Sequence, residues 1–196
     1  AYIVLAATVL LIVVMLHADI SLKVNIYKVL TTFLPYFVFF MYLMNTTKSV
    51  TQAMFINCDH SMLTYTFYRI PKNILKLFQI RLREMIKINL LPTVILGGGY
   101  GIVLIIGGGF HQLPYALIAF VSLISMSVFF STHYLILYYL LQPYNAHTEM
   151  KNPVYSIIVS LTYVICFAFT KLSLPIFSFG IICIVFCDCY CIIACI

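Results

Sequence analysis

Long apolar runs occupy most of the chain and limit what it can fold into. Each is ended by Gly, Pro or a charged residue, and most approach the length of about 20 residues that a helix needs to cross a bilayer. They are too uniformly apolar for barrel strands, and in lipid the backbone must be satisfied within the segment. We therefore predict helical spans at roughly 1–16, 30–45, 90–108, 114–141, 154–171 and 174–196.

The composition excludes a water-soluble fold. Of the 196 residues, 64% are hydrophobic and 8% are charged, whereas about 25% charged residues are usual in soluble domains. The spans leave no room for a large soluble catalytic domain. We expect an all-α integral membrane protein of about six transmembrane helices plus one cytoplasmic amphipathic helical segment. Its parts are two helices in residues 1–45, the polar segment 46–89, and four helices in 90–196.

The positions of Lys and Arg predict the orientation, because short cytoplasmic loops carry the excess of these residues. With the 46–89 segment in the cytoplasm, eight basic residues lie inside, and Lys23, Lys28 and Lys171 lie outside. This predicts a multi-pass protein of the cell membrane with both ends of the chain in the cytoplasm. Because the chain starts at Ala1 and stops within an apolar run, we expect the natural protein to be longer.

The one long polar segment, residues 51–90, holds six of the eleven basic residues. From Pro71, a residue favoured in the first turn of a helix, apolar residues recur at helical spacing until Asn89, which is polar where the pattern requires an apolar residue. Arg81 falls near the flank, whereas the other cations form a stripe. Such a stripe meets anionic lipid headgroups or docks on a protein. The residues predicted to dock on a partner are Arg69, Lys72, Lys76, Arg83 and Lys87.

Cys58, Asp59 and His60 stand side by side before this helix, and these residue types occur in metal and nucleophilic sites. Adjacent residues point in different directions on a helix, and no second cluster with zinc-ligand spacing lies nearby. We therefore predict neither a metal site nor a catalytic residue here. Asp59, followed by Ser61, is typical of a helix start, where a carboxylate accepts from free N–H groups.

Three stretches resemble a known family: MFINCDHSMLTYTFYR, ILKLFQIRLREMIKINLLP and FFSTHYLILYYLLQPYN. They make residues 50–165 similar to the membrane subunits of a family of bacterial ATP-binding-cassette exporters. The resemblance implies a permease that works with a separate cytoplasmic ATPase subunit, and it carries over no catalytic or substrate-binding residue. A second permease copy or half and membrane lipids are the other partners expected.

Two triple glycines, at 97–99 and 107–109, invite comparison with a phosphate-binding loop. The Gly-Lys-Ser/Thr that such a loop requires does not follow either of them. We therefore expect no cofactor and no enzymatic activity in this chain, with ATP hydrolysis on another subunit. The first group, extended by a GxxxG spacing, permits close helix packing or a hinge. The residues concerned are Gly97, Gly98, Gly99 and Gly101.

His133 and Asp188 are the ionisable residues expected within the spans, where such groups are costly and mark function by default. They are candidates for an intramembrane polar path in transport or gating. The alternatives are that His133 bonds a neighbouring helix and that Asp188 lies near the inner end of its span. Cysteines recur every fourth residue on the last span, from Cys183 to Cys195, which favours packing over metal binding, because one helix cannot surround a tetrahedral ion.

Topology and resemblance together favour the permease component of an exporter. Two alternatives stay open. One is a membrane-embedded enzyme that acts on lipid or peptide through Cys58, Asp59, His60 or His133. The other is a non-catalytic scaffold or channel-like module. Nucleic-acid binding is not expected, because no motif for it is present and the membrane topology explains the basic face.

Overall fold

The computed structural model of the chain describes residues 2–59, 65, 70–144 and 152–195. The regular elements in these ranges are all helical, which confirms the predicted all-α class. They are α1 Tyr2–His17, α2 Ile20–Thr31, α3 Leu34–Met44, α4 Thr47–Met54, the π-helical turn η1 Phe55–Asp59, α6 Pro71–Gly108, the 3-10 turn η3 Phe110–Gln112, α7 Leu113–Leu141, α8 Pro153–Phe169 and α9 Ile176–Cys195.

Three helices in the described ranges are long and apolar enough to cross a membrane: α6, the Phe110–Leu141 helix that contains α7, and α9. A fourth span results if Asn25–Thr31 and Leu34–Asp59, which are bent by 69°, count as one. The apolar helices Ile3–His17 and Pro153–Phe169 are shorter. By length and composition the chain is therefore suited to a membrane, whereas six spans and their orientation stay predictions.

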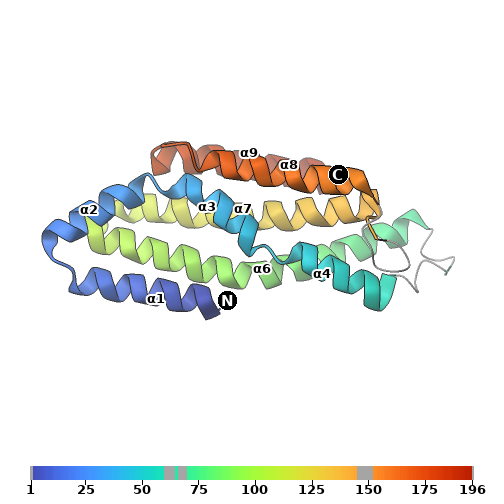
Figure 1. The fold of residues 1–196 in the computed structure, drawn as a ribbon, viewed down its shortest axis with the longest axis horizontal. Coiled ribbons are helices and arrows are strands. Elements are labelled where there is room, and N and C mark those ends of the chain that lie inside the picture. The colour runs from blue at the N-terminus through green and yellow to red at the C-terminus, as the bar shows by residue number, and fades with distance from the viewer. Residues whose placement is uncertain (1, 60–64, 66–69, 145–151, 196) are drawn as a thin grey trace.

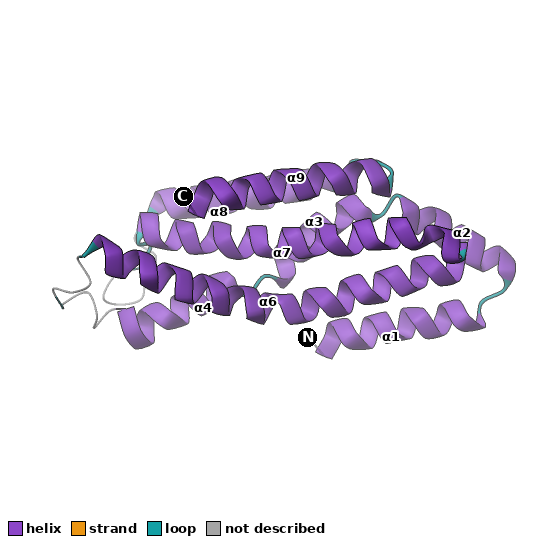
Figure 2. Cartoon of the chain, turned by 180° about the vertical axis from the view of Figure 1, so that it is seen from behind, coloured by secondary structure: helices purple, strands orange, loops and turns teal. Residues whose placement is uncertain are grey.

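Helices α6 and α7 form the centre of the bundle (Figure 1). They run antiparallel and are joined by a turn at Gly109, whose positive φ of 79° suits a glycine. α1 lies beside the C-terminal half of α6, whereas α4 lies near its N-terminal half. On the other side α9 packs along α7, and α3 contacts α7 and α8, as the view from behind also shows (Figure 2). The main core lies where α3, α6, α7 and α9 meet and includes Leu34, Leu104 and Leu123.

α6 differs from the expected division of the chain. The amphipathic helix and the span predicted to start at residue 90 are one uninterrupted helix of 38 residues that continues past Pro92. At 1.5 Å per residue its length is about 57 Å, nearly twice the roughly 30 Å of a hydrocarbon core. If its apolar C-terminal half crosses the membrane, its basic N-terminal half extends beyond it as a rigid continuation of the span.

Gly97 and Gly99 of α6 lie at close helix contacts, and the helix is unbroken through all its glycines up to Gly108. A Cβ atom added at Gly97 would lie 2.9 Å from the Phe120 ring of α7, and one at Gly99 would lie 2.9 Å from Cβ of Thr8 in α1. At Gly101 the nearest atom, Cβ of Ala116, would be 3.6 Å away. Gly98 has no neighbour within 4 Å of such an atom. Gly97 and Gly99 therefore support close packing, and a hinge role for the glycines stays a prediction.

The difference between two adjacent glycines gives a matched test. In Gly99→Leu the new side chain collides with Thr8 and must push α1 away from α6, at a cost of about 2 kcal/mol of unfolding free energy. Gly98→Leu places the same side chain in open space and gains helix propensity. Thermal unfolding in one detergent should show a lower Tm only for Gly99→Leu, and equal losses in both variants would contradict the close contact with α1.

Candidate functional site

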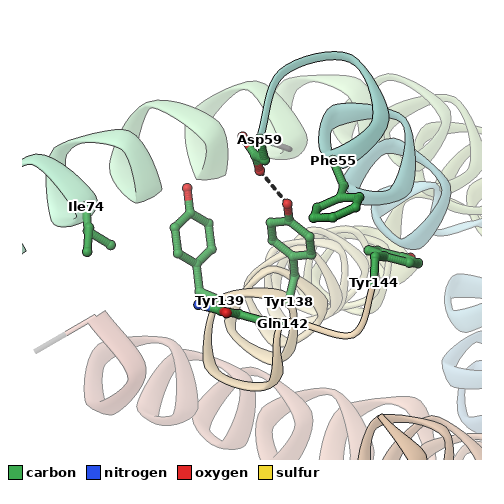
Figure 3. Close-up of a pocket in the computed structure, with 7 residues that line it drawn as sticks. All are labelled: Phe55, Asp59, Ile74, Tyr138, Tyr139, Gln142 and Tyr144. Atoms are coloured by element: carbon green, nitrogen blue, oxygen red, sulfur yellow. Dashed lines mark hydrogen bonds between the residues drawn. The ribbon is translucent and has the colours of Figure 1, made fainter. Parts of the chain in front are cut away.

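At the polar end of the bundle, a buried ion pair connects η1 to α6, two segments that are separated in sequence. Nη1 of Arg81, in α6, donates to Oδ2 of Asp59, at the end of η1, at 2.7 Å. The second guanidinium nitrogen pairs with Oδ1 of the same carboxylate. The hydroxyl of Tyr138 donates to Asp59, as Figure 3 shows, and Nη1 of Arg81 lies 2.9 Å from the hydroxyl oxygen of Tyr139. We call these four residues the Asp59–Arg81 clamp.

Burial makes this pairing obligatory. Asp59 is 1% exposed and Arg81 is 8% exposed, and an unpaired charge in such a place is strongly unfavourable. The two-nitrogen contact with a carboxylate is the geometry that a guanidinium prefers. The guanidinium carbon also lies 5.7 Å from the centre of the Tyr139 ring, within the range of a cation–π contact.

Local structure positions each member of the clamp. The π-helical turn η1 ends at Asp59 and delivers its carboxylate to the interior. Arg81 points inward because it lies on the face of α6 that also buries Met85 and Asn89. α7 ends just beyond Tyr138 and Tyr139, where Gln142 takes the left-handed conformation with φ 41° and Pro143 follows.

A cavity of about 160 Å³ lies next to the clamp (Figure 3). Its walls are mostly aromatic, and its polar groups include the Asp59 carboxylate and the Gln142 amide. Burial raises the pKa of Tyr144, so this phenol of the cavity wall is neutral. The Asp59 carboxylate is neutralised by Arg81. Its lining residues are Phe55, Asp59, Ile74, Tyr138, Tyr139, Gln142 and Tyr144.

The position of Arg81 along α6 indicates its depth. Arg81 lies about 40 Å of helix before Gly108. If Gly108 marks one surface of a hydrocarbon core of about 30 Å, the clamp lies about 10 Å beyond the other surface. Under that assumption the clamp would lie in the headgroup zone, where ion pairs and tyrosine hydroxyls are tolerated.

A second polar cluster joins α6 to the break between α3 and α4. The side-chain oxygen of Asn89 accepts from the N–H of Thr46 at 3.1 Å and from its hydroxyl at 2.9 Å. The amide nitrogen donates to the hydroxyls of Thr47 and Ser131, each at 2.9 Å. The Asn89 side chain thus makes all four of the hydrogen bonds available to an amide, two as acceptor and two as donor. Asn89 therefore holds the start of α4 against both central helices.

His133, in α7, connects three helices of the bundle. Its Nδ1 lies 2.9 Å from the hydroxyl oxygen of Tyr190 in α9, and its Nε2 lies 3.3 Å from Oγ1 of Thr162 in α8. The ring stacks on Phe129 at 5.6 Å between centroids. Asp188 is exposed on the outer surface of α9, so the structure does not bring these two residues together. The polar path predicted for the pair stays a prediction.

The predicted docking residues that the structure describes all lie on the outside of α6. Lys72, Lys76, Arg83 and Lys87 are exposed. The ammonium group of Lys87 pairs with Glu84 at 2.7 Å, so part of its charge is already neutralised. Arg69 lies outside the described residues. The contrast with Arg81, which is buried on the opposite side, gives α6 one outward cationic face and one inward cation.

The Cys58–Asp59–His60 trio is divided by the fold. Cys58 is exposed, Asp59 is buried, and His60 lies outside the described residues. No group of His, Cys, Asp and Glu able to hold a metal ion occurs among the residues described. Asp59 ends the η1 turn, and both carboxylate oxygens are bonded to Arg81 or Tyr138. The helix start that Asp59 is predicted to cap lies outside the described residues, so capping by Asp59 stays a prediction. The cysteine stripe of α9 contains one close pair, with Sγ of Cys183 and Cys187 3.8 Å apart.

The clamp was not predicted from the sequence. One signal was available, because helical spacing placed Arg81 away from the basic stripe. Its partner Asp59 is 22 residues away in sequence, and no local pattern joins the two. Comparison of the chain with models of known protein families, with curated proteins and with solved structures gives no match in any of the three.

Proposed function

We propose that this chain is the membrane permease subunit of an ATP-binding-cassette exporter, and that a separate cytoplasmic ATPase docks on the exposed cations of α6. The observation that carries the proposal is the continuity of α6 from its exposed basic half into its apolar span. A partner that moves the basic half must also move the span, because no loop separates them. The resemblance of residues 50–165 to such permeases supports the same function.

The clamp gives the α4–η1 segment a part in this coupling. It fixes the end of η1 to α6 and to the end of α7 through Asp59, Arg81 and Tyr138. Movement of the basic half of α6 therefore displaces the end of α7 as well. The substrate path in this proposal runs between α7, α8 and α9. It passes His133, which belongs to α7 and bonds to side chains of α8 and α9.

Charge reversal of the stripe tests the docking surface. Lys72→Glu/Lys76→Glu should reduce the ATPase that co-purifies from native membranes by about tenfold, because several close charge pairs become repulsive. Lys28→Glu is the matched control, since Lys28 is exposed on α2 at the opposite end of the bundle. The assay measures co-purified nucleotide hydrolysis and identifies a subunit with a Gly-x-x-x-x-Gly-Lys-Ser/Thr loop. A chain that retains no such ATPase even with trapped nucleotide would overturn the proposal.

A membrane-embedded enzyme that acts on lipid or peptide is the second candidate. It is favoured by one observation, the cavity that Asp59 and Tyr138 line near the headgroup zone. Against it, the carboxylate already accepts three hydrogen bonds, from Arg81 and Tyr138, which leaves it little capacity to take a proton from a substrate. Turnover of labelled lipid that is unchanged in folded Asp59→Asn and in alanine variants of Cys58, His60 and His133 would remove this candidate.

A further inference from the structure

α9 carries an acidic side chain on its outward, apolar surface. Asp188 is exposed, although it lies inside the candidate span Ile176–Ile193. The exposed side chains around it on α9 are large and apolar: Val185 is 57% exposed, Phe186 61% and Ile192 60%. Such an apolar surface suits either lipid or another transmembrane helix. The Asp188 carboxyl group favours a helix over lipid, because a helix can supply a partner for the charge.

If α9 crosses a bilayer, the depth of Asp188 prevents water from solvating it freely. Asp188 lies about 18 Å of helix after Ile176 and about 8 Å before Ile193. Aspartate has one methylene group, so its carboxyl group cannot extend to the surface as the long side chains of lysine and arginine do. An acidic group held within hydrocarbon is expected to face a partner.

The described part of the chain offers Asp188 no partner. The two ion pairs among the described residues are Asp59–Arg81 and Glu84–Lys87, and both involve α6. α7, α8 and α9 contain no lysine or arginine. The imidazole of His133 is already bonded to the neighbouring helices.

A second copy of the chain does not fit this surface well. Two copies that meet through α9 about a twofold axis would place Asp188 near its own equivalent, and like charges close together are unfavourable. A lysine or arginine at the same depth supplies the missing charge and its hydrogen-bond donors. Charge complementarity therefore favours a different chain over a second copy.

We propose that the outward face of α9 binds a transmembrane helix of another protein, one that carries a lysine or arginine side chain at the depth of Asp188. Val185 and Ile192, one turn before and after, supply the apolar contacts on either side. This proposal does not depend on the exporter function, because the basic stripe of α6 lies on a different part of the molecule.

Designed helices provide the test. The full chain, labelled with a donor fluorophore, is reconstituted in phosphatidylcholine vesicles with acceptor-labelled poly-leucine/alanine helices that carry one lysine, one glutamate or one leucine at matched depth. Energy transfer measures association. The lysine helix should associate about tenfold more tightly than the leucine helix. Asp188→Asn should remove this preference, and Asp188→Lys should transfer it to the glutamate helix.

Two controls keep the result interpretable. Ile182→Ala changes an exposed apolar residue of α9 and should keep the preference for lysine. Asp188→Asn is nearly isosteric, and its helical circular dichroism shows whether the bundle is intact. Equal association of the three helices with the wild-type chain would overturn the proposal. So would a lysine preference that survives Asp188→Asn, or energy transfer between two copies of the chain that this variant abolishes.

Discussion

Asp59→Asn should lower the unfolding free energy by about 3 kcal/mol, the typical cost of removing one partner from a buried ion pair. The side chain keeps its size, and its oxygen still accepts from Tyr138, but Arg81 retains a buried positive charge without a counter-charge. Arg83→Gln is the matched control, because Arg83 is exposed two residues further along α6, and it should change stability by less than about 0.5 kcal/mol. Thermal or denaturant unfolding in detergent measures both.

The double variant Asp59→Leu/Arg81→Met separates burial of charge from loss of packing. Replacing both partners by apolar side chains removes the uncompensated charge, so stability should recover by more than half of the single-variant loss. If the loss of unfolding free energy in the double variant equalled the sum of the losses in Asp59→Leu and Arg81→Met, this would contradict the idea that the clamp requires pairing of the two charges. Equal, small effects of Asp59→Asn and Arg83→Gln would show that the pair is not buried.

Asn89→Leu should cost about 3 kcal/mol as well, for a different reason. The substitution leaves the buried hydroxyls of Thr47 and Ser131 without the amide that now donates to them, and buried unsatisfied groups cost about 1–3 kcal/mol each. It also removes the acceptor of the Thr46 N–H and hydroxyl. Amide hydrogen exchange at the start of α4 should speed up, because Asn89 holds this end of the helix to α6.

The exposed Gln79, on the same helix, provides the comparison for Asn89. Gln79→Leu changes the side chain in the same way and should leave exchange at Thr46 and Thr47 unaltered. Protection at these two amides that is the same in Asn89→Leu as in the unchanged chain would contradict the role of Asn89 at the α3–α4 break.

The apolar runs of the sequence predicted several helices closely. The run at 114–141 corresponds to α7 Leu113–Leu141, and the run at 154–171 corresponds to α8 Pro153–Phe169. These predictions succeed because a long apolar run between breakers has one stable form in a core or in lipid. The run at 30–45 is less regular, since the backbone between Thr31 and Leu34 bends and divides α2 from α3.

Contacts between distant segments could not be predicted in the same way. Helical spacing separated Arg81 from the basic stripe and marked Asn89 as a polar residue in an apolar position, so both inward polar side chains left a local signal. Their partners, Asp59 for Arg81 and Thr46 and Thr47 for Asn89, depend on how α4 and η1 fold back on α6. The sequence neighbours of Asp59, including Ser61, suggest a helix cap and give no sign of its ion pair with Arg81. The continuity of α6 was missed because a change from amphipathic to apolar composition resembles a boundary.

Photo-crosslinking from the basic stripe tests the central claim most directly. A photoreactive amino acid replaces Lys76 in the full chain, and Lys28 in a control, and native membranes are irradiated with nucleotide trapped. The proposed function predicts that position 76 forms an adduct with an ATPase subunit that contains a Gly-x-x-x-x-Gly-Lys-Ser/Thr loop, and that position 28 forms none. Adducts with lipid alone at position 76 would contradict it, since the basic half of α6 would then bind headgroups and no ATPase.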